Sequence, residues 1–347
     1  MFYKNIIRPL LFRLSRKDPE TAHHLVITLL ALMGKHRTSC QLVSTLWGTK
    51  PEKKLERTAM GLKFPHPVLL AAGFDKNALA IRMLAEIFGG VEIGTVTNEP
   101  QIGNPRPRMF RLSEDEALIN RMGFNNDGAT QVAERLAEIL KGGQLKVPLG
   151  ISFGKNKDTP ANNIDAVIDN HLEGFRKLAR FANYAVLNCA SPNTPDLRTL
   201  LERGPLGSLI EEVQKTKRSL GLASLPLVVK LSPDMDWDQI EAALEVCNQF
   251  GVAGIIAANT SLGRESLKSS TRSEIGGLSG APIYHRALEL VRHVRKELPN
   301  ICVIGSGGIN SPERATRMLD FGADLIQIYT GFVYEGPSFV RSITQAI

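Results

Sequence analysis

Eight short apolar segments, most of them separated by stretches with helical periodicity, constrain the fold of this chain more than any other feature. A strand that is apolar throughout is buried on both faces, which is typical of a parallel sheet covered by helices. Eight such units over roughly 280 residues match the size of a (β/α)8 barrel. We therefore predict an α/β fold, a (β/α)8 TIM barrel. The predicted strands are residues 67–73, 91–96, 147–154, 184–188, 225–232, 253–259, 302–308 and 324–331.

The length of 347 residues is sufficient for one barrel and an appendage. We expect residues 1–45 to form a helical N-terminal segment and residues 46–347 to form the barrel domain. A doubly wound open sheet is the alternative, but no GxGxxG motif follows the first predicted strand. The four cysteines form no CxxC pair, so their spacing fits neither a zinc site nor a disulfide framework, and we expect no bound metal.

Positive charge is concentrated at the N-terminus. Seven basic and two acidic residues fall within the first 40 positions, so this segment carries +5 of the net charge of +7. The rest of the chain is almost balanced and has no basic stripe with interleaved aromatic residues, which argues against a nucleic-acid-binding protein. The charge favours a smaller anionic partner: a phosphorylated cofactor, a carboxylate substrate or anionic lipid.

The first 40 residues predict two short amphipathic helices. The second has a clear start, with Asp18 at the N-cap and Pro19 at the first helical position, and Gly34 ends it. Its apolar run LVITLLALM is far shorter than the ~20 residues that cross a bilayer. An acidic cap before the run and no cleavage site after it fit a signal peptide poorly. From the residues alone, a monotopic membrane patch and a helical hairpin packed on the barrel both stay open.

Polar or glycine-rich residues follow most of the predicted strands. These segments read GFDKN, GTVTN, FGKNKDT, NCASPNT, KLSPD, NTS, GSGGI and YTG. Active sites of (β/α)8 barrels lie at the carboxyl ends of the strands, so we expect these segments to build one site together. The insertion between residues 97 and 128 breaks the alternation, and we expect it to pair as a hairpin over the barrel mouth.

The residue types in these segments limit the chemistry. Amides supply uncharged donors and acceptors suited to a small planar ligand, although any one asparagine is commonly a turn residue. A lysine near a strand end, such as Lys76 or Lys230, can form a Schiff base, hold a cofactor's negative charge or pair with a carboxylate. Glycines in residues 305–308 and 329–331 favour phosphate binding there. The asparagines are Asn120, Asn125, Asn188, Asn193 and Asn259.

Taken together, the motifs identify a known family. The chain resembles the class 2 dihydroorotate dehydrogenases, the membrane-associated, quinone-linked type that contains FMN. The resemblance covers nearly the whole chain, including the N-terminal helices. It is carried by DPETAHH, LAAGFDKNA, EIGTVT, GNPRPRMFRL, INRMGFNN, GKNKDTP, NCASPNTPDLR, VVKLSPD, IIAANTS, GGLSGAP, GSGGI and IQIYTGFVYEGP.

The resemblance implies oxidation of (S)-dihydroorotate to orotate in pyrimidine biosynthesis, and it assigns roles to residues. Ser191 is the general base that removes the C5 proton, with water and Thr194 as its relay, while C6 passes hydride to FMN. The implied substrate residues are Lys76, Asn120, Arg121, Met122, Gly123, Phe124, Asn188, Asn193, Asn259 and Thr260. The implied FMN residues are Ala72, Gly73, Phe74, Asp75, Lys76, Thr95, Ser152, Asn188, Lys230, Ala258, Gly280, Gly308, Tyr329 and Thr330.

For the N-terminal helices, the resemblance implies a quinone tunnel lined by His23, Arg111 and Tyr329. It favours the monotopic interpretation over the packed hairpin, with peripheral contact at the cytoplasmic face of the inner or cell membrane. Anionic lipid would add roughly 1 kcal/mol per basic residue near the surface. We expect a monomer with dihydroorotate, orotate and a membrane quinone as its partners and no nucleic acid.

Several positions depart from the family pattern. Ser152 replaces the usual asparagine, Ala258 a flavin-contacting threonine and Asp196 a turn glycine; Asn98 and Glu99 also differ. These changes affect the expected flavin affinity and loop motion rather than the base. Because class 1 relatives use a cysteine base, Cys189 is also considered, and we assign it to packing. The alternatives are another FMN-dependent barrel oxidoreductase, a lyase with a Lys230 Schiff base and a flavinless membrane-binding scaffold.

Overall fold

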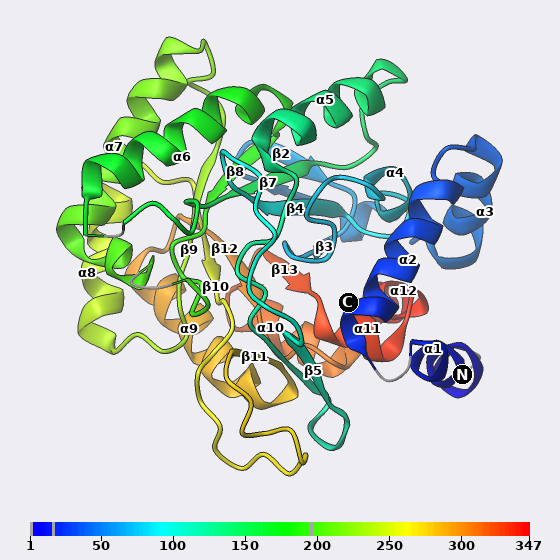
Figure 1. The fold of residues 1–347 in the computed structure, drawn as a ribbon. Helices are drawn as coiled ribbons and strands as arrows, with labels where there is room; N and C mark the ends of the chain where they lie inside the picture. Colours follow the sequence, from blue (N-terminus) through cyan, green and yellow to red (C-terminus); the bar gives the residue numbers. More distant parts are fainter. Residues whose placement is uncertain (1–2, 16–17, 161, 195–196) are drawn as a thin grey trace.

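The eight predicted strands close into a barrel in a computed structural model that describes residues 3–15, 18–160, 162–194 and 197–347. The strands pair in parallel in the order β10, β12, β13, β3, β4, β7, β8 and β9 (Figure 1). The predicted TIM barrel is therefore confirmed. The bounds are β3 Val68–Leu70, β4 Gly90–Val96, β7 Leu149–Phe153, β8 Tyr184–Leu187, β9 Leu227–Lys230, β10 Gly254–Ala257, β12 Cys302–Ser306 and β13 Leu325–Ile328.

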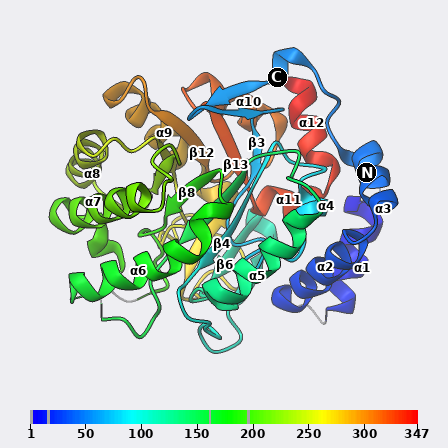
Figure 2. The same cartoon turned by 90° about the horizontal axis from the view of Figure 1, so that it is seen from above.

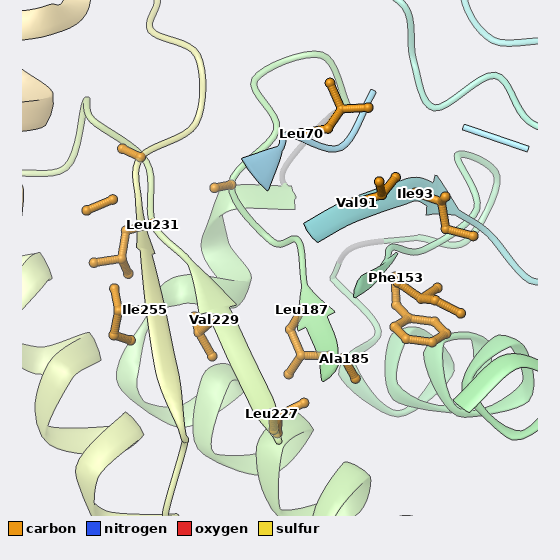
Figure 3. Close-up of a cluster of buried hydrophobic side chains, with 14 of the residues drawn as sticks. Leu70, Val91, Ile93, Phe153, Ala185, Leu187, Leu227, Val229, Leu231 and Ile255 are labelled. Carbon is orange, nitrogen blue, oxygen red and sulfur yellow. The ribbon is translucent and has the colours of Figure 1, made fainter. Parts of the chain in front are cut away.

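Side chains alternate along each barrel strand between the helices and the barrel interior, as the two-residue period of a strand requires. Figure 3 shows part of the outward set, in which Leu227 and Val229 of β9 pack with Leu187 of β8. Val228 points the other way and packs with Leu69 and Tyr184 inside the barrel. Since both sets are apolar, the strands read as unbroken apolar runs in the sequence.

Helices surround the barrel (Figure 2). The helical periodicity between the predicted strands is confirmed, for example by α5 Gly128–Lys141, α8 Trp237–Gln249 and α10 Pro312–Asp320. The other helices around the barrel are α4 Ile81–Leu84, α6 Ile164–Leu178, α7 Arg203–Ser219, α9 Tyr284–Glu297, α11 Thr330–Glu335 and α12 Ser338–Ala346. Short helical turns lie at η2 Lys53–Leu55, η3 Ser113–Asp115, η4 Ala179–Phe181, η5 Leu197–Leu201 and η6 Ala281–Ile283.

Two small antiparallel sheets complete the barrel ends. The insertion forms the predicted hairpin, β5 Met109–Leu112 with β6 Ala117–Asn120. A third strand that was not predicted, β11 Gly277–Gly280, pairs with β6 across more than 150 residues of sequence. At the other end of the barrel, β1 Arg57–Ala59 and β2 Leu62–Phe64 form a hairpin that packs on the inward-facing apolar cluster. The site is therefore confined to the mouth under β5, β6 and β11.

The N-terminal helices lie beside the barrel, against α11 and α12 (Figure 1). They are η1 Tyr3–Ile7, α1 Arg8–Leu14, α2 Pro19–Met33 and α3 Arg37–Trp47. The predicted cap is confirmed, since the Asp18 carboxylate accepts hydrogen bonds from the backbone N–H groups of Glu20 and Thr21. The third helix, α3, was not predicted as a separate element, and the proposed domain boundary at residue 45 falls inside it. Within the described ranges, none of the helices is long and apolar enough to span a bilayer.

Candidate active site

A cavity lies where the carboxyl ends of the barrel strands meet β6, β11 and α2. It contains about 1510 Å³ of empty space, part of which is open to solvent. It extends from the strand ends to His23 and Ile27 of α2. Its wall includes these predicted residues: His23, Ala72, Gly73, Phe74, Asp75, Lys76, Thr95, Asn120, Met122, Gly123, Phe124, Asn188, Ser191, Asn193, Lys230, Ala258, Asn259, Thr260, Gly280, Gly308, Tyr329 and Thr330.

Three residues predicted for the site lie away from the cavity wall. Ser152 is fully buried in β7, and its hydroxyl shares a hydrogen bond of 2.9 Å with Thr95. The side chain of Arg121 points to the outer loops and forms an ion pair of 2.8 Å with Glu274. Arg111 stacks on the Phe12 ring at 3.7 Å, between β5 and α1. Asp196, the replaced turn glycine, lies outside the described residues.

Ser191 faces the cavity from the loop that follows β8, and its side chain is almost completely buried. Its hydroxyl oxygen accepts a hydrogen bond of 3.3 Å from the backbone N–H of Asn193. Thr194, three residues after Ser191, is also buried. Cys189 is fully buried in the hydrophobic core, and burial raises the pKa of its thiol to about 12. Its position agrees with the packing role and not with that of a base.

The asparagine amides on the wall bond to one another. Asn259 donates to the Asn188 side chain at 3.1 Å, and Asn188 donates to the Thr95 hydroxyl at 2.7 Å. Across the cavity, Asn193 donates to the Asn120 side chain at 3.3 Å. These segments come from β4, β6, β8 and β10, so the barrel brings together amides that are far apart in sequence. Two groups of amides on one cavity wall can recognise a planar ligand with C=O and N–H groups at its edges.

Lys76 reaches the cavity from the loop after β3 and donates a hydrogen bond to the Asn125 side chain. Burial, helped by the positive charge of Arg108, lowers the pKa of Lys76 to about 7. An anion bound beside this amine would favour its charged form. Asn125 was noted in the sequence as one of five asparagines but was given no role, and its contact with Lys76 is visible only in the fold.

Lys230 lies beneath the amides at the inner end of the cavity, with a buried polar cluster below it. Gln327 donates to the Glu92 carboxylate at 2.6 Å, and the Tyr184 hydroxyl donates to the same oxygen at 3.4 Å. Burial raises the pKa of Glu92 and lowers the pKa of Lys230, while each charge favours the other. Sequence reasoning missed Glu92 and Gln327. The available signal was a carboxylate inside one largely apolar strand, VEIGTV, and an amide inside another, LIQI.

Backbone and hydroxyl groups converge at the end of the cavity formed by β11, β12 and β13. The hydroxyls of Ser279 and Thr330 share a hydrogen bond of 2.8 Å, and Gly280 lies next to them. Gly308 has a φ of +69°, and a Cβ there would stand 2.7 Å from the backbone nitrogen of Tyr284. Only glycine fits this turn without a clash, and it leaves the backbone accessible. Such a cradle of N–H groups and hydroxyls suits a phosphate.

The cavity also reaches the N-terminal helices. His23 and Ile27 of α2 line it together with Phe74 and Tyr329. The His23 ring contacts Phe74 edge-on with centroids 5.1 Å apart, and Phe74 contacts Tyr329 at 5.6 Å. Burial, with the charge of Lys76 nearby, lowers the pKa of His23 to about 4, so its ring is neutral at pH 7. This part of the wall is therefore aromatic, with a neutral His23 ring.

The residues on the wall fit a phosphorylated flavin. The glycine turn and hydroxyls suit the phosphate, and the Lys230 amine enters the cavity without a hydrogen-bond partner among the described residues. The Oε1 atoms of Glu92 and Gln327 likewise have no partner within the described part of the chain. Gln327 lines the cavity and bonds to Glu92 behind it. Buried polar atoms that lack partners at a cavity wall, as in Gln327, indicate a site for a polar ligand or bound water.

Comparisons with known proteins agree with this geometry. A family model described as "Dihydroorotate dehydrogenase" matches residues 54–347. The "Dihydroorotate dehydrogenase (quinone)" of Chloroflexus aurantiacus is 47% identical over 100% of this chain and 96% of its own length. That of Thermosynechococcus vestitus is 40% identical over 99% and 96%.

The solved structures agree as well. The crystal structure of DHODH in complex with ferulenol from Eimeria tenella superposes with a TM-score of 0.87 at 35% identity, covering 98% of this chain and 93% of that one. The chain therefore belongs to the flavin-dependent dihydroorotate dehydrogenase family, and within that family to the quinone-type class 2.

Proposed function

We propose that this protein oxidises (S)-dihydroorotate to orotate with FMN as the hydride acceptor and a membrane quinone as the final electron acceptor. The observation that carries the proposal is the extent of one cavity. Its wall includes Ser191 and the amides, Lys230 and the glycine turn, and His23 of α2. A substrate, a flavin and a quinone would each find complementary chemistry along it.

The substrate end supports proton abstraction by Ser191. Its hydroxyl faces the cavity, and we infer that it takes the C5 proton of dihydroorotate and passes it on through water and Thr194. Asn120, Asn188, Asn193, Asn259 and Thr260 would hold the pyrimidine ring, with backbone and apolar contacts from residues 121–124. Lys76 would hold the substrate carboxylate. Bound FMN supplies the hydride acceptor for C6.

The cofactor residues follow from the same wall. Lys230 and Thr95 would contact the flavin ring, next to residues 72–76, Asn188 and Ala258. Gly280, Gly308, Tyr329 and Thr330 would enclose the phosphate and ribityl chain. Ser152 would act through Thr95, since its hydroxyl bonds to that residue and not to the cavity. A lysine amine beside the flavin favours negative charge on the ring when it accepts electrons.

The quinone end involves the N-terminal helices. We infer that His23 and Tyr329 line the quinone path and that Arg111 lies at its outer part, near Phe12. Exposed apolar side chains on α2 and α3 support peripheral contact with the cytoplasmic face of the cell or inner membrane: Leu25, Leu29, Leu32, Leu42 and Leu46. The proposed form is a monomer, which sedimentation in detergent would check.

Absorbance of the bound flavin tests the reaction. The purified protein should be yellow, and anaerobic dihydroorotate should bleach it. A ubiquinone or menaquinone analogue should restore the colour, whereas fumarate and NAD⁺ should not. Protein that contains FMN but is not bleached by dihydroorotate would support another barrel oxidoreductase. Colourless protein that folds and binds no FMN would contradict both flavin reactions and support a lyase with a Lys230 Schiff base or a flavinless membrane-binding scaffold.

Ser191→Ala tests the base. Stopped-flow reduction of the flavin by dihydroorotate should slow by about 10²–10⁴-fold, the range for one general base, with FMN content unchanged. Cys189→Ala is the matched control because it removes a neighbouring buried side chain that faces the core. It should keep fast reduction. Fast reduction in Ser191→Ala would move the role of base to another residue.

A further inference from the structure

A buried carboxylate on α2 has no role in the proposed chemistry. Glu20 is 2% exposed, and it does not line the cavity. Arg108, itself 6% exposed, donates to it from Nε to both oxygens at 3.1 Å and from Nη2 to Oε1 at 2.7 Å. Arg106 adds a second cation at 3.1 Å. A buried, multiply bonded ion pair between two distant segments fixes their relative position.

The same arginine holds the loop that precedes β5. Its Nη1 donates to the carbonyl oxygens of Ile102 at 2.6 Å and Asn104 at 2.8 Å. Gly103, between them, has a φ of +79°, and a Cβ there would stand 2.7 Å from Arg108 Nη1. The loop is therefore wrapped closely around the guanidinium, and its shape depends on where the guanidinium lies.

This loop in turn contacts the substrate side of the cavity. The Asn104 side chain donates to the carbonyl oxygen of Asn193 at 3.4 Å and to that of Arg121 at 3.0 Å. Its backbone N–H donates to the carbonyl oxygen of Met122 at 3.0 Å. Asn193 lies two residues after Ser191 and bonds to its hydroxyl. Glu20, Arg108, Asn104 and Asn193 thus form a continuous path from α2 to the loop of the proposed base.

We propose that Glu20 is a positioning residue for the substrate loop, acting through Arg108 and Asn104. The inference rests on the proposed function and extends it: α2 contributes to the quinone end with His23 and, one turn earlier, stabilises the substrate end with Glu20. Without the carboxylate, Arg108 loses its anionic partner, and the loop populates conformations in which Asn193 is displaced. Ligand affinity then falls in proportion to the fraction of the competent conformation.

Glu20→Gln tests the proposal because it removes the charge and keeps the shape. We expect the dissociation constant of orotate, measured from the perturbed flavin spectrum, to rise about 10-fold, as for a competent fraction of about one tenth. The KM for dihydroorotate with ferricyanide as acceptor should rise by a similar factor, with kcat at saturation changed less than about twofold, because saturating substrate restores the loop.

Glu335→Gln is the matched control. Lys4 and Glu335 form an ion pair of 2.6 Å that also ties the N-terminal segment to the barrel, and Glu335 lies on α11, with no hydrogen bond to the substrate loop among the described residues. This variant should leave orotate affinity within about twofold of wild type. An equal loss of orotate affinity in both variants would overturn the proposal. It would mean that loose docking of the helices, and not the path through Arg108, weakens orotate binding.

Asn104→Ala tests the second step without leaving a buried charge unpaired. It should weaken orotate binding at least as much as Glu20→Gln does. The double variant should bind orotate no more weakly than Asn104→Ala alone, since both substitutions act on one path. Additive effects, or unchanged orotate affinity in folded Glu20→Gln, would contradict the proposal. If Glu20→Gln yields no folded holoenzyme, Asn104→Ala carries the test alone, and unchanged orotate affinity in that variant would contradict the proposal. A wild-type protein that does not bind orotate would refute the proposed function instead.

Discussion

The barrel and the N-terminal helices use the same apolar residue types in opposite ways. In the barrel, Leu69 is completely buried in the interior and Leu70 is completely buried in the core shared with the helices. On α2, Leu25, Leu29 and Leu32 repeat at helical spacing and are each about half exposed, at 50%, 55% and 53%. Scattered exposed leucines are ordinary, but a row on one face of a helix marks a surface for an apolar partner.

The two regions also differ in how they are held in place. The barrel is closed by parallel strand pairing and a continuous apolar core. Both apolar and polar contacts hold the N-terminal segment. Ile27 and Val43 belong to the same apolar core, while the Tyr3 hydroxyl donates to the carbonyl oxygen of Val333 at 2.8 Å and Arg8 donates to that of Tyr334 at 2.9 Å. The leucines of α2 that lie outside this core stay exposed and are available to lipid or quinone.

The sharpest test of this contrast compares two leucines. Leu69→Ala should lower the free energy of unfolding by about 2–5 kcal/mol, because it removes a side chain that is completely buried inside the barrel. Leu29→Ala should change it by no more than about 0.5 kcal/mol, because that side chain is half exposed. Denaturant unfolding of each variant measures both values. Equal losses would show that the row on α2 is covered within the folded chain.

Vesicle binding tests the partner of the exposed row. Changing Leu25, Leu29 and Leu32 together to Ser should weaken binding to phosphatidylcholine–phosphatidylglycerol vesicles by about 100-fold, from roughly 1 kcal/mol per half-buried leucine. Flavin reduction by dihydroorotate should stay at the wild-type rate. Leu262→Ser is the control, because that leucine is 50% exposed on a barrel loop. An equal loss of vesicle binding in the control, or no loss in the triple variant, would show that α2 is not the surface that binds the membrane.

The smallest expected effect is the pH dependence at Lys76, on the barrel side. Its pKa in the free protein is about 7, and a carboxylate ligand binds the charged form. Above pH 7 the amine must take up a proton on binding, so the dissociation constant of orotate should rise up to about tenfold per pH unit, and below pH 7 it should level off. Lys76→Met should bind more weakly and lose this dependence. If the dissociation constant of the variant changed with pH as steeply as that of the wild type, the pH dependence would belong to another titratable group.

Much of the barrel could be predicted because its signal is local. The run LPLVVKLS shows that β9 is buried on both faces before any partner is known. Asp18 followed by Pro19 shows where α2 begins. The strand-end rule then places the site at the barrel mouth, and the cavity wall includes 22 predicted residues. By contrast, Ser152 and Arg121 belong to the right segments, but their side chains face a neighbouring strand and an outer loop.

The sequence by itself determined the barrel, its strand ends and the residue types that meet there. The reason is that the periodicity of strands and helices depends on residues close together in the sequence. Only the tertiary structure decided which distant groups touch. β11 joins β6 across more than 150 positions, and Glu20 meets Arg108 across 88. Such contacts depend on how whole helices and strands pack against one another. The spacing of residues along the chain does not predict a pairing between segments so far apart.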